Sequence, residues 1–272
     1  MKAMPAFYVV ATPIGNLEDI TLRALRVLRE VGLIAAEDTR TTNILLRHYD
    51  IKTPLTSYHE RNKETKIDYL LHVLQEKDVA LVSDAGTPGM SDPGYKLIAA
   101  AIEQGITVIP VPGVAAPIAA VMVSGLPLQQ TTFLGFLPRQ KGERRKMLGA
   151  IVGERSTLVI FEAPHRLQAA LRDIRDILGN RRITVCREMT KIHEEVFRST
   201  VEQALEHFAE PRGEFTLVIE GNTATIEMGK DKVLGELRRL RQQDVPAREA
   251  TRQLAEITGL PRKELYKLWL SL

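Results

Sequence analysis

Hydrophobic positions follow two alternating spacings along the first 125 residues. Short apolar runs typical of buried strands recur between segments whose apolar residues return every three or four positions, which is typical of helices. The expected strands are 7–11, 33–36, 79–82 and 106–111, and the expected helices are 21–31, 62–75, 93–104 and 114–124. Because the two patterns take turns, they predict a mostly parallel sheet with helices on its faces.

A second alternating set follows a break at residues 127–138, which show no clear period and contain Gly135 and two prolines. We therefore place a link between two domains there. The strands expected beyond it are 157–161, 183–187 and 215–219, and the helices are 166–178 and 201–208. The fold class is thus α/β, with a first domain over residues 1–125 and a second over residues 126–225.

The pattern changes again near residue 230, where three short helices are expected at 233–242, 247–257 and 261–270. We assign residues 226–272 to a helical extension. Its last two helices are separated by Thr258-Gly259-Leu260, a spacing that suits a helix-turn-helix. Nucleic-acid binding and a role in packing or dimerisation both remain open for this segment.

Composition narrows the class of protein. A chain of 272 residues with 44% hydrophobic and 26% charged residues is globular and long enough for two domains. A single cysteine, Cys186, excludes a disulfide framework and a cysteine-rich metal site and fits the cytoplasm. The first residues show no signal-peptide pattern, and the uncharged stretch 106–138 is interrupted by glycines and prolines, so no membrane segment is expected.

Basic residues gather in one segment although the net charge is only +3. A solvated face is one interpretation of this cluster, and a surface that contacts phosphate groups is the other. Glu143 is the only acidic residue within the cluster, whose members are Arg139, Lys141, Arg144, Arg145 and Lys146.

Loops rich in glycine and proline follow three of the predicted strands, at residues 11–16, 83–94 and 112–116. Ligands of open α/β sheets bind at the carboxyl ends of the strands, and glycine lets the backbone approach them closely. No phosphate loop, dinucleotide fingerprint, serine-hydrolase motif or metal-ligating pair of histidines is present. Backbone donors, Asp84 and Thr87 suit a nucleoside-like or amino-acid-like ligand better than a polyphosphate.

Five segments together resemble a known family. They are 8–21 (YVVATPIGNLEDIT), 36–40 (AEDTR), 82–94 (VSDAGTPGMSDPG), 110–116 (PVPGVAA) and 161–166 (FEAPHR). They resemble the tetrapyrrole-methylase-like S-adenosylmethionine-dependent methyltransferases, within them the ribosomal RNA small subunit methyltransferase I branch, over about residues 7–221. Gly86-Thr87-Pro88 stands where tetrapyrrole-modifying relatives often carry Gly-Asp-Pro, which favours the ribosomal branch.

The resemblance implies two α/β domains of the tetrapyrrole methylase type with S-adenosylmethionine in the cleft between them, and a homodimer. It implies 2′-O-methylation of a cytidine ribose in the decoding region of 16S rRNA, with RNA or the small ribosomal subunit as partner. The helices after residue 226 resemble the helical extension of that branch.

The resemblance also implies site residues. Those expected to contact the cofactor are Pro13, then Asp84, Gly86, Thr87, Pro88 and Met90, then Gly113, Val114, Ala115 and Ala116, and from the second domain Phe161, Cys186 and Phe215. Core packing is the alternative for the last three. No metal is expected.

A ribose hydroxyl is a weak nucleophile, so a side chain near the cleft is expected to accept its proton or stabilise its alkoxide. The pool for this role is Glu37, Asp38, Arg40, Glu162, His165, Arg166, Glu188 and Lys191. For the segment 37–40 the alternative is a helix cap with acidic residues in its first turn.

Two other functions compete. A tetrapyrrole methyltransferase would share the cofactor site but needs an apolar substrate cleft, whereas aromatic residues make up only 5% of this chain. A regulator that senses S-adenosylmethionine would bind nucleic acid through residues 230–272 without catalysis.

Overall fold

The computed structural model describes residues 5–60, 62–92, 94–223 and 228–272. Pro93, where the sequence predicted the start of a helix, lies outside the described residues, as do residues 1–4 and the expected boundary at residues 225 and 226. The chain divides into two compact units, Met1–Gly221 and Asn222–Leu272, and each is described by itself.

The first sheet of the larger unit is fully parallel, with strand order β3-β2-β4-β1-β5. Its strands are β1 (Ala6–Val10), β2 (Leu33–Ala36), β3 (Leu55–Ser57), β4 (Val79–Val82) and β5 (Thr107–Val111). The prediction of a mostly parallel sheet is confirmed, and all four expected strands are present. Only β3 was missed, because three half-buried residues are too short to show a period.

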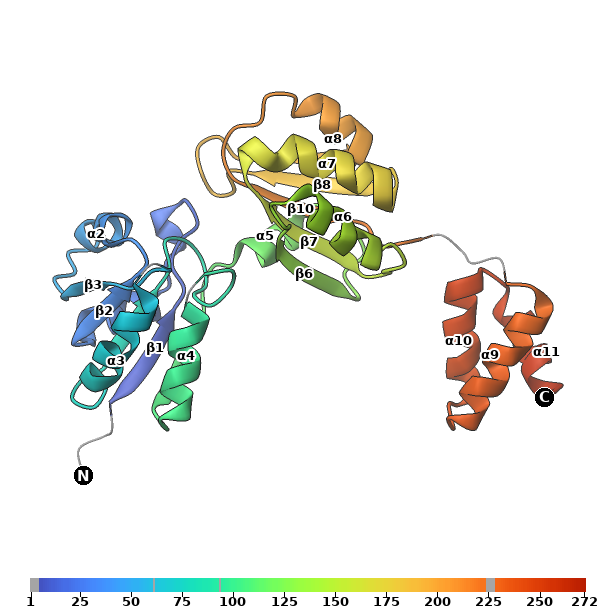
Figure 1. The fold of residues 1–272 in the computed structure, drawn as a ribbon, viewed down its shortest axis with the longest axis horizontal. Coiled ribbons are helices and arrows are strands. Elements are labelled where there is room, and N and C mark those ends of the chain that lie inside the picture. The colour runs from blue at the N-terminus through green and yellow to red at the C-terminus, as the bar shows by residue number, and fades with distance from the viewer. Residues whose placement is uncertain (1–4, 61, 93, 224–227) are drawn as a thin grey trace. The chain divides into compact units, whose positions relative to one another are not determined.

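Helices cover both faces of this sheet (Figure 1). Leu25, Leu28 and Leu45 pack against one face, and Leu70 and Leu97 pack against the other. The elements are a 3-10 turn (Leu17–Asp19), α1 (Leu22–Glu30), α2 (Thr39–His48), α3 (Lys63–Val73) and α4 (Gly94–Glu103). The sequence missed α2, whose first residues are polar and whose cap is the Asp38 side chain.

The second sheet is mixed, with strand order β6-β7-β10-β8-β9 and one parallel pairing, β6 with β7. Its strands are β6 (Thr131–Phe136), β7 (Thr157–Glu162), β8 (Arg182–Arg187), β9 (Glu195–Thr200) and β10 (Phe215–Ile219). The segment 127–138, in which we placed the domain link, thus contributes a strand to this sheet. The sequence also missed β9.

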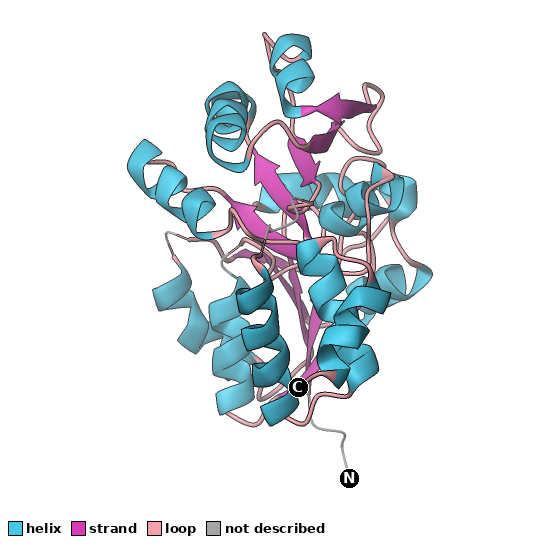
Figure 2. Cartoon of the chain, turned by 90° about the vertical axis from the view of Figure 1, so that its right-hand side faces the viewer, coloured by secondary structure: helices cyan, strands magenta, loops and turns pink. Residues whose placement is uncertain are grey.

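Helices lie on both faces of the second sheet as well, and in Figure 2 the strands have helices on either side. The helices are α5 (Ala116–Ser124), α6 (Lys141–Ala150), α7 (Pro164–Leu178) and α8 (Val201–His207). Ala120 of α5 packs on Val159 and Val218, and the other three helices cover the opposite face. The segment of α5 was counted in the first domain, yet it packs on the second sheet; the division at residue 125 stays a prediction.

The smaller unit contains α9 (Lys230–Gln242), α10 (Ala247–Thr258) and α11 (Arg262–Leu270), which confirms the three expected helices. They share a core that includes Val233, Leu237, Leu254 and Leu265. Gly259 ends α10 with a φ of 70°, a conformation that glycine adopts without steric cost. Within the described residues, no helix has the length and apolarity needed to cross a bilayer.

Candidate functional site

A cavity of about 550 Å³ lies among the strand-end loops of the first sheet and residues of the second. The lining residues from the first 117 positions are Ile14, Glu37, Ser83, Asp84, Ala85, Gly86, Thr87, Met90, Ser91, Asp92, Ala115, Ala116 and Pro117. The lining residues from the second sheet and its loops are Phe136, Phe161, Glu162, Ala163, Pro164, His165, Cys186, Met189, Glu214, Phe215 and Thr216. Its size is typical of small-ligand sites.

The loop between β4 and α4 provides most of the first wall, and its own carboxylate fixes its shape. Asp92 accepts hydrogen bonds from the backbone N–H groups of Gly89, at 2.8 and 2.9 Å, and Gly94, at 2.7 Å. Gly86 and Gly89 have φ values of 78° and 88°, where a side chain would be strained. The loop therefore presents backbone groups to the cavity in one defined conformation.

Hydrogen bonds join this loop to its two neighbours. Thr12 and Gly86 exchange a pair of backbone hydrogen bonds, at 2.9 and 3.0 Å. The Thr87 hydroxyl donates to the carbonyl of Val114 at 3.2 Å. Gly113 lies so close to Ala11 that an added Cβ would be 3.0 Å from its side chain. The three Gly/Pro-rich loops that the sequence singled out thus form one continuous wall.

Two carboxylates, Glu37 and Asp84, lie beside each other in this wall. The Asp84 carboxylate accepts from the Asp38 N–H at 2.9 Å, and the Asp84 N–H donates to Glu37 at 3.4 Å. Burial raises the pKa of both carboxyl groups, and their proximity raises that of Glu37 further. Such a pair favours a positively charged group or a proton in the cavity.

The second wall is apolar and aromatic. The ring of Phe161 packs edge-on against Phe133, with centroids 5.1 Å apart, and lies 5.4 Å from Phe136, which is half exposed. Cys186 and Phe215 belong to neighbouring strands and are almost fully buried. Burial raises the pKa of the Cys186 thiol to about 11, so this thiol is a neutral apolar surface.

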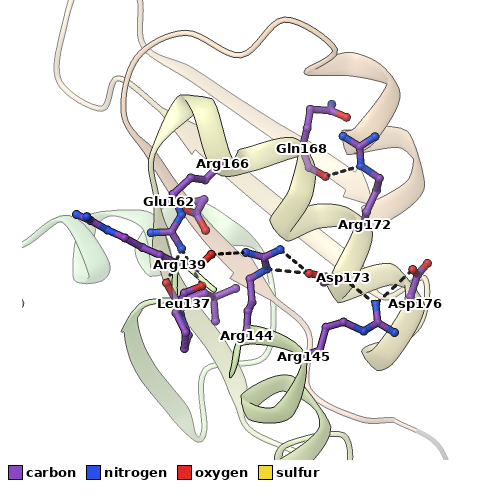
Figure 3. Close-up of polar contacts among 11 residues, drawn as sticks. Leu137, Arg139, Arg144, Arg145, Glu162, Arg166, Gln168, Arg172, Asp173 and Asp176 are labelled. Carbon is purple, nitrogen blue, oxygen red and sulfur yellow. Dashed lines mark hydrogen bonds and ion pairs between the residues drawn. The ribbon is translucent and has the colours of Figure 1, made fainter. Parts of the chain in front are cut away.

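Glu162 contributes to this wall, but its carboxylate is directed away from solvent. Its side chain is fully buried, and its Oε1 atom accepts from the Ala163 N–H at 2.9 Å and lies 3.2 Å from Arg166 Nε. The Arg166 guanidinium also donates to the carbonyls of Leu137 and Pro138, and Figure 3 shows Arg166, Glu162 and Leu137 close together. Burial raises the pKa of Glu162. The contact between Glu162 and Arg166 links the end of β7 to the first turn of α7 and so supports this wall.

Three members of the predicted proton-transfer pool line the cavity: Glu37, Glu162 and His165. Asp38 caps α2 and forms an ion pair with Arg40 at 2.6 Å, which lowers the pKa of Asp38 to about 2 and leaves Arg40 90% exposed. The remaining three are Arg166, described above, and Glu188 and Lys191, which form an ion pair at 2.9 Å in the β8–β9 loop. Of the two alternatives for 37–40, the helix cap is present at Asp38. Glu37 lines the cavity, and its role in proton transfer stays a prediction.

Nine of the thirteen predicted cofactor residues line the cavity. They are Asp84, Gly86, Thr87, Met90, Ala115, Ala116, Phe161, Cys186 and Phe215. The other four, Pro13, Pro88, Gly113 and Val114, belong to the same loops but are not among the lining residues, and their contact with the cofactor stays a prediction.

Some lining residues were not expected. Ser83, Ala85, Ser91 and Asp92 belong to the loop that the sequence had identified. Phe136 and Met189 gave no signal, since Phe136 lies in a segment without a period and Met189 follows a strand whose antiparallel pairing is not visible in the sequence.

The five basic residues of the predicted RNA surface separate into two groups. Arg139, Lys141 and Lys146 are exposed. Arg144 is only 6% exposed, and its guanidinium contacts Asp173 at 2.7 and 2.8 Å (Figure 3). Arg145 contacts Asp173 at 2.7 Å and Asp176 at 3.7 Å. Arg144 is therefore removed from the surface available to phosphates, because its charge is buried between α6 and α7.

No cluster of three or more histidine, cysteine or acidic side chains that could hold a metal ion occurs among the described residues.

Comparison with known families gives two matches. A family model described as Tetrapyrrole (Corrin/Porphyrin) Methylases matches residues 6–205. A second, described as the RsmI C-terminal HTH domain, matches residues 231–272. The matches cover the cavity and the three-helix unit respectively.

Curated relatives named Ribosomal RNA small subunit methyltransferase I are similar over 80–99% of this chain. The Halalkalibacterium halodurans protein is 46% identical and covers 96% of this chain and 93% of its own length. The Synechocystis protein is 48% identical and covers 99% of both chains. The Thermotoga maritima protein is 51% identical over 221 residues, which are 99% of that protein but 80% of this chain.

Solved structures support the fold. Uroporphyrin-III-C-methyltransferase from Thermus thermophilus superposes with a TM-score of 0.57 at 22% identity, covering 78% of this chain and 93% of that chain. A cobalt precorrin-4 methyltransferase superposes with a TM-score of 0.60 at 17% identity, covering 78% and 94%. At these identities the likeness extends to the fold alone.

Proposed function

The chain belongs to the Tetrapyrrole (Corrin/Porphyrin) Methylases, and from this membership we propose that it uses S-adenosylmethionine to methylate a cytidine ribose 2′-oxygen in the decoding region of 16S rRNA. The observation that carries the proposal is the cavity, in which paired carboxylates face an aromatic wall beside glycine-rich loops. Relatives named as small-subunit RNA methyltransferases, at 46–48% identity over 96–99% of this chain, support RNA as the methyl acceptor.

The chemistry of the cavity wall fits S-adenosylmethionine. Asp84 complements the positive charges of its sulfonium and ammonium groups, and Phe161 and Phe215 offer apolar surface to the adenine. Exposed backbone groups of the loop 83–94 can hydrogen-bond its ribose and carboxylate. We propose these residues, with Gly86, Thr87 and Met90, as the cofactor site.

When bound, S-adenosylmethionine supplies an activated methyl group, so the chain mainly has to orient the ribose oxygen and accept its proton. We propose Glu37 as the proton acceptor, because it lines the cavity and forms no ion pair within the described part of the chain. His165, exposed at the start of α7, is the second candidate. Glu162 ranks behind them because its side chain is fully buried and its Oε1 atom lies 3.2 Å from Arg166 Nε.

Gly86→Ala tests the loop conformation. Alanine at a φ of 78° costs about 1–2 kcal/mol, so we expect lower stability and weaker S-adenosylmethionine binding. Calorimetric titration and chemical denaturation measure the two effects. Gly149→Ala is the matched control: Gly149 lies in α6 with open space around its Cα, so alanine there should slightly raise stability and leave binding unchanged.

The exposed residues Arg139, Lys141 and Lys146 form the proposed RNA surface, with Arg145 at its edge. Changing Arg139, Lys141 and Lys146 to serine should weaken binding to small ribosomal subunits. The slope of log affinity against log salt concentration should also become shallower, by about one unit for each lost phosphate contact. Filter binding at several salt concentrations measures both. S-adenosylmethionine affinity should be unchanged; equal RNA affinity in variant and parent would remove this surface from the proposal.

Mapping the methylated product distinguishes the proposed RNA methyltransferase from a tetrapyrrole methyltransferase and from a non-catalytic regulator. Labelled methyl groups should be transferred to small subunits that lack the modification, and the label should map to a cytidine 2′-oxygen. Transfer to a tetrapyrrole instead of RNA would establish the tetrapyrrole enzyme, and nucleic-acid binding without transfer to either acceptor would establish the regulator.

We also propose a homodimer and a cytoplasmic location, in keeping with a ribosomal substrate. Ile118 and Met122 of α5 are 61% and 75% exposed and offer an apolar contact face. Light scattering of the purified chain tests the dimer, and a monomeric mass at micromolar concentration would contradict it.

A further inference from the structure

The three-helix unit carries an open surface pocket, of about 390 Å³, where α10 and α11 begin. Three of its five lining residues are arginines: Arg248, Arg252 and Arg262, with Pro246 and Glu249 completing the wall. Unlike an isolated arginine on a surface, these three come from two helices and face one concave space. The proposed methyl-transfer chemistry uses none of them.

The single carboxylate in this pocket is already paired. Glu249 accepts from Arg252 at 2.6 and 3.0 Å and from the Gln253 amide at 3.0 Å. These hydrogen bonds lower the pKa of Glu249 to about 2, so it stays ionised and offsets the charge of Arg252. Glu249 also interacts with the charge of Arg262, and three arginines facing one carboxylate leave the pocket with two positive charges in excess.

Arg248 and Arg262 are held next to each other. Arg262 of α11 donates one hydrogen bond, at 3.2 Å, to the carbonyl of Arg248 in α10, and this contact leaves its other guanidinium donors available. Within the described part of the chain, neither guanidinium forms an ion pair with a carboxylate. A doubly positive pocket with planar, forked donors matches a tetrahedral oxyanion.

We propose that this pocket binds a backbone phosphate of small-subunit RNA through Arg248 and Arg262. The inference rests on the proposed function, which makes RNA the substrate. RNA is favoured as the source of the phosphate because residues 230–272 carry ten basic and six acidic side chains and the pocket lies at the start of both helices of the helix-turn-helix.

The pocket serves docking rather than chemistry. All of its lining residues belong to the three-helix unit, and none of them lines the proposed cofactor cavity. Loss of the pocket should therefore raise the KM for the subunit and leave the kcat at saturating subunit unchanged.

The test compares two full-length double variants. Arg248→Ser with Arg262→Ser empties the pocket of its excess charge and keeps the Glu249–Arg252 pair. Arg238→Ser with Lys267→Ser removes the same charge from exposed positions outside the pocket. The probes are small ribosomal subunits lacking the modification and a protein-free 16S rRNA transcript.

We expect the pocket variant to lose about tenfold or more in affinity for both probes, and its salt slope to fall by about one or two, since each lost phosphate contact lowers it by about one. The control variant should keep the slope and lose less than about threefold. Unchanged affinity of the pocket variant, or equal losses in the two variants, would overturn the proposal.

Two further readouts distinguish a failure of the phosphate proposal from a misfolded variant and from a failure of the proposed function. A loss confined to whole subunits, with the transcript bound normally, would identify a protein contact and overturn the phosphate assignment. Unchanged S-adenosylmethionine affinity and circular dichroism show that the variant is folded, and Arg248→Lys with Arg262→Lys should restore part of the affinity. If the parent chain transfers no methyl group, the proposed function fails, whereas the two binding comparisons still decide the pocket.

Discussion

Replacing Glu37 with glutamine should slow methyl transfer by about 10²- to 10⁴-fold, the usual contribution of a general base. Glutamine keeps the size and the hydrogen-bonding oxygen near the Asp84 N–H but cannot accept the ribose proton. Single-turnover transfer at saturating cofactor and saturating subunits measures the effect. We expect S-adenosylmethionine affinity to change far less than the rate.

The pH dependence of the rate gives a second readout. Burial raises the pKa of Glu37, so the parent rate should increase with pH through a value above the ordinary 4.5, whereas the glutamine variant should lack this step. The same shift predicts the sign of a stability effect. A carboxyl group whose pKa is raised on folding destabilises the fold once pH exceeds its unfolded value, so the variant should be more stable at neutral pH.

Asp38→Asn is the matched control for Glu37. Asparagine at this position would keep the cap on α2, and Asp38 is paired with Arg40 rather than directed into the cavity. The rate of this variant should stay within about threefold of the parent. If Glu37→Gln instead weakens cofactor binding and leaves the saturated rate intact, Glu37 binds the cofactor and His165 becomes the proton acceptor to test.

Asp173→Ala should lower the free energy of unfolding by about 3–5 kcal/mol, because it leaves the buried Arg144 guanidinium without its counter-charge. Arg145 would face Arg144 across the same gap, which adds repulsion between like charges. Urea denaturation followed by circular dichroism measures the change. Asp176→Ala, at a half-exposed carboxylate that pairs with Arg175 at 2.9 Å, should cost less than about 1 kcal/mol.

Acid should reproduce this loss in the parent protein. Burial acts to raise the pKa of Asp173, but its hydrogen bonds to Arg145 and Arg144 outweigh burial and lower that pKa below 3.8. The stabilisation is therefore present above the ordinary pKa and is lost as pH falls through the lowered value. Equal stability of parent and Asp173→Ala at neutral pH would show that the pair contributes nothing.

The ion pair also bears on the proposed RNA surface. It fixes α6 against α7, and α6 carries Lys141 and Lys146. A loosened α6 should weaken RNA binding without affecting S-adenosylmethionine, since the cofactor loops belong to other elements.

The sequence by itself determined the parallel sheet, its Gly/Pro-rich loops and the three carboxyl-terminal helices. Each of these depends on information carried by residues close in the chain: apolar runs at β2 and β4, a helical period at α9 and α10, and glycines such as Gly86 and Gly259 at left-handed positions. Local periodicity and local backbone geometry are what hydrophobic patterns report. The family resemblance rested on the same loops.

Only the tertiary structure decided which charged side chains face solvent and which complete the cavity wall. Arg144 and Asp173 are 29 residues apart, so a run of basic residues could not show that one member is buried in an ion pair. Phe136 and Met189 reach the cavity because of strand pairings in the second sheet, which no local pattern specifies. Likewise, α5 is apolar along the chain, but its packing on the second sheet depends on a surface that forms only when distant strands meet.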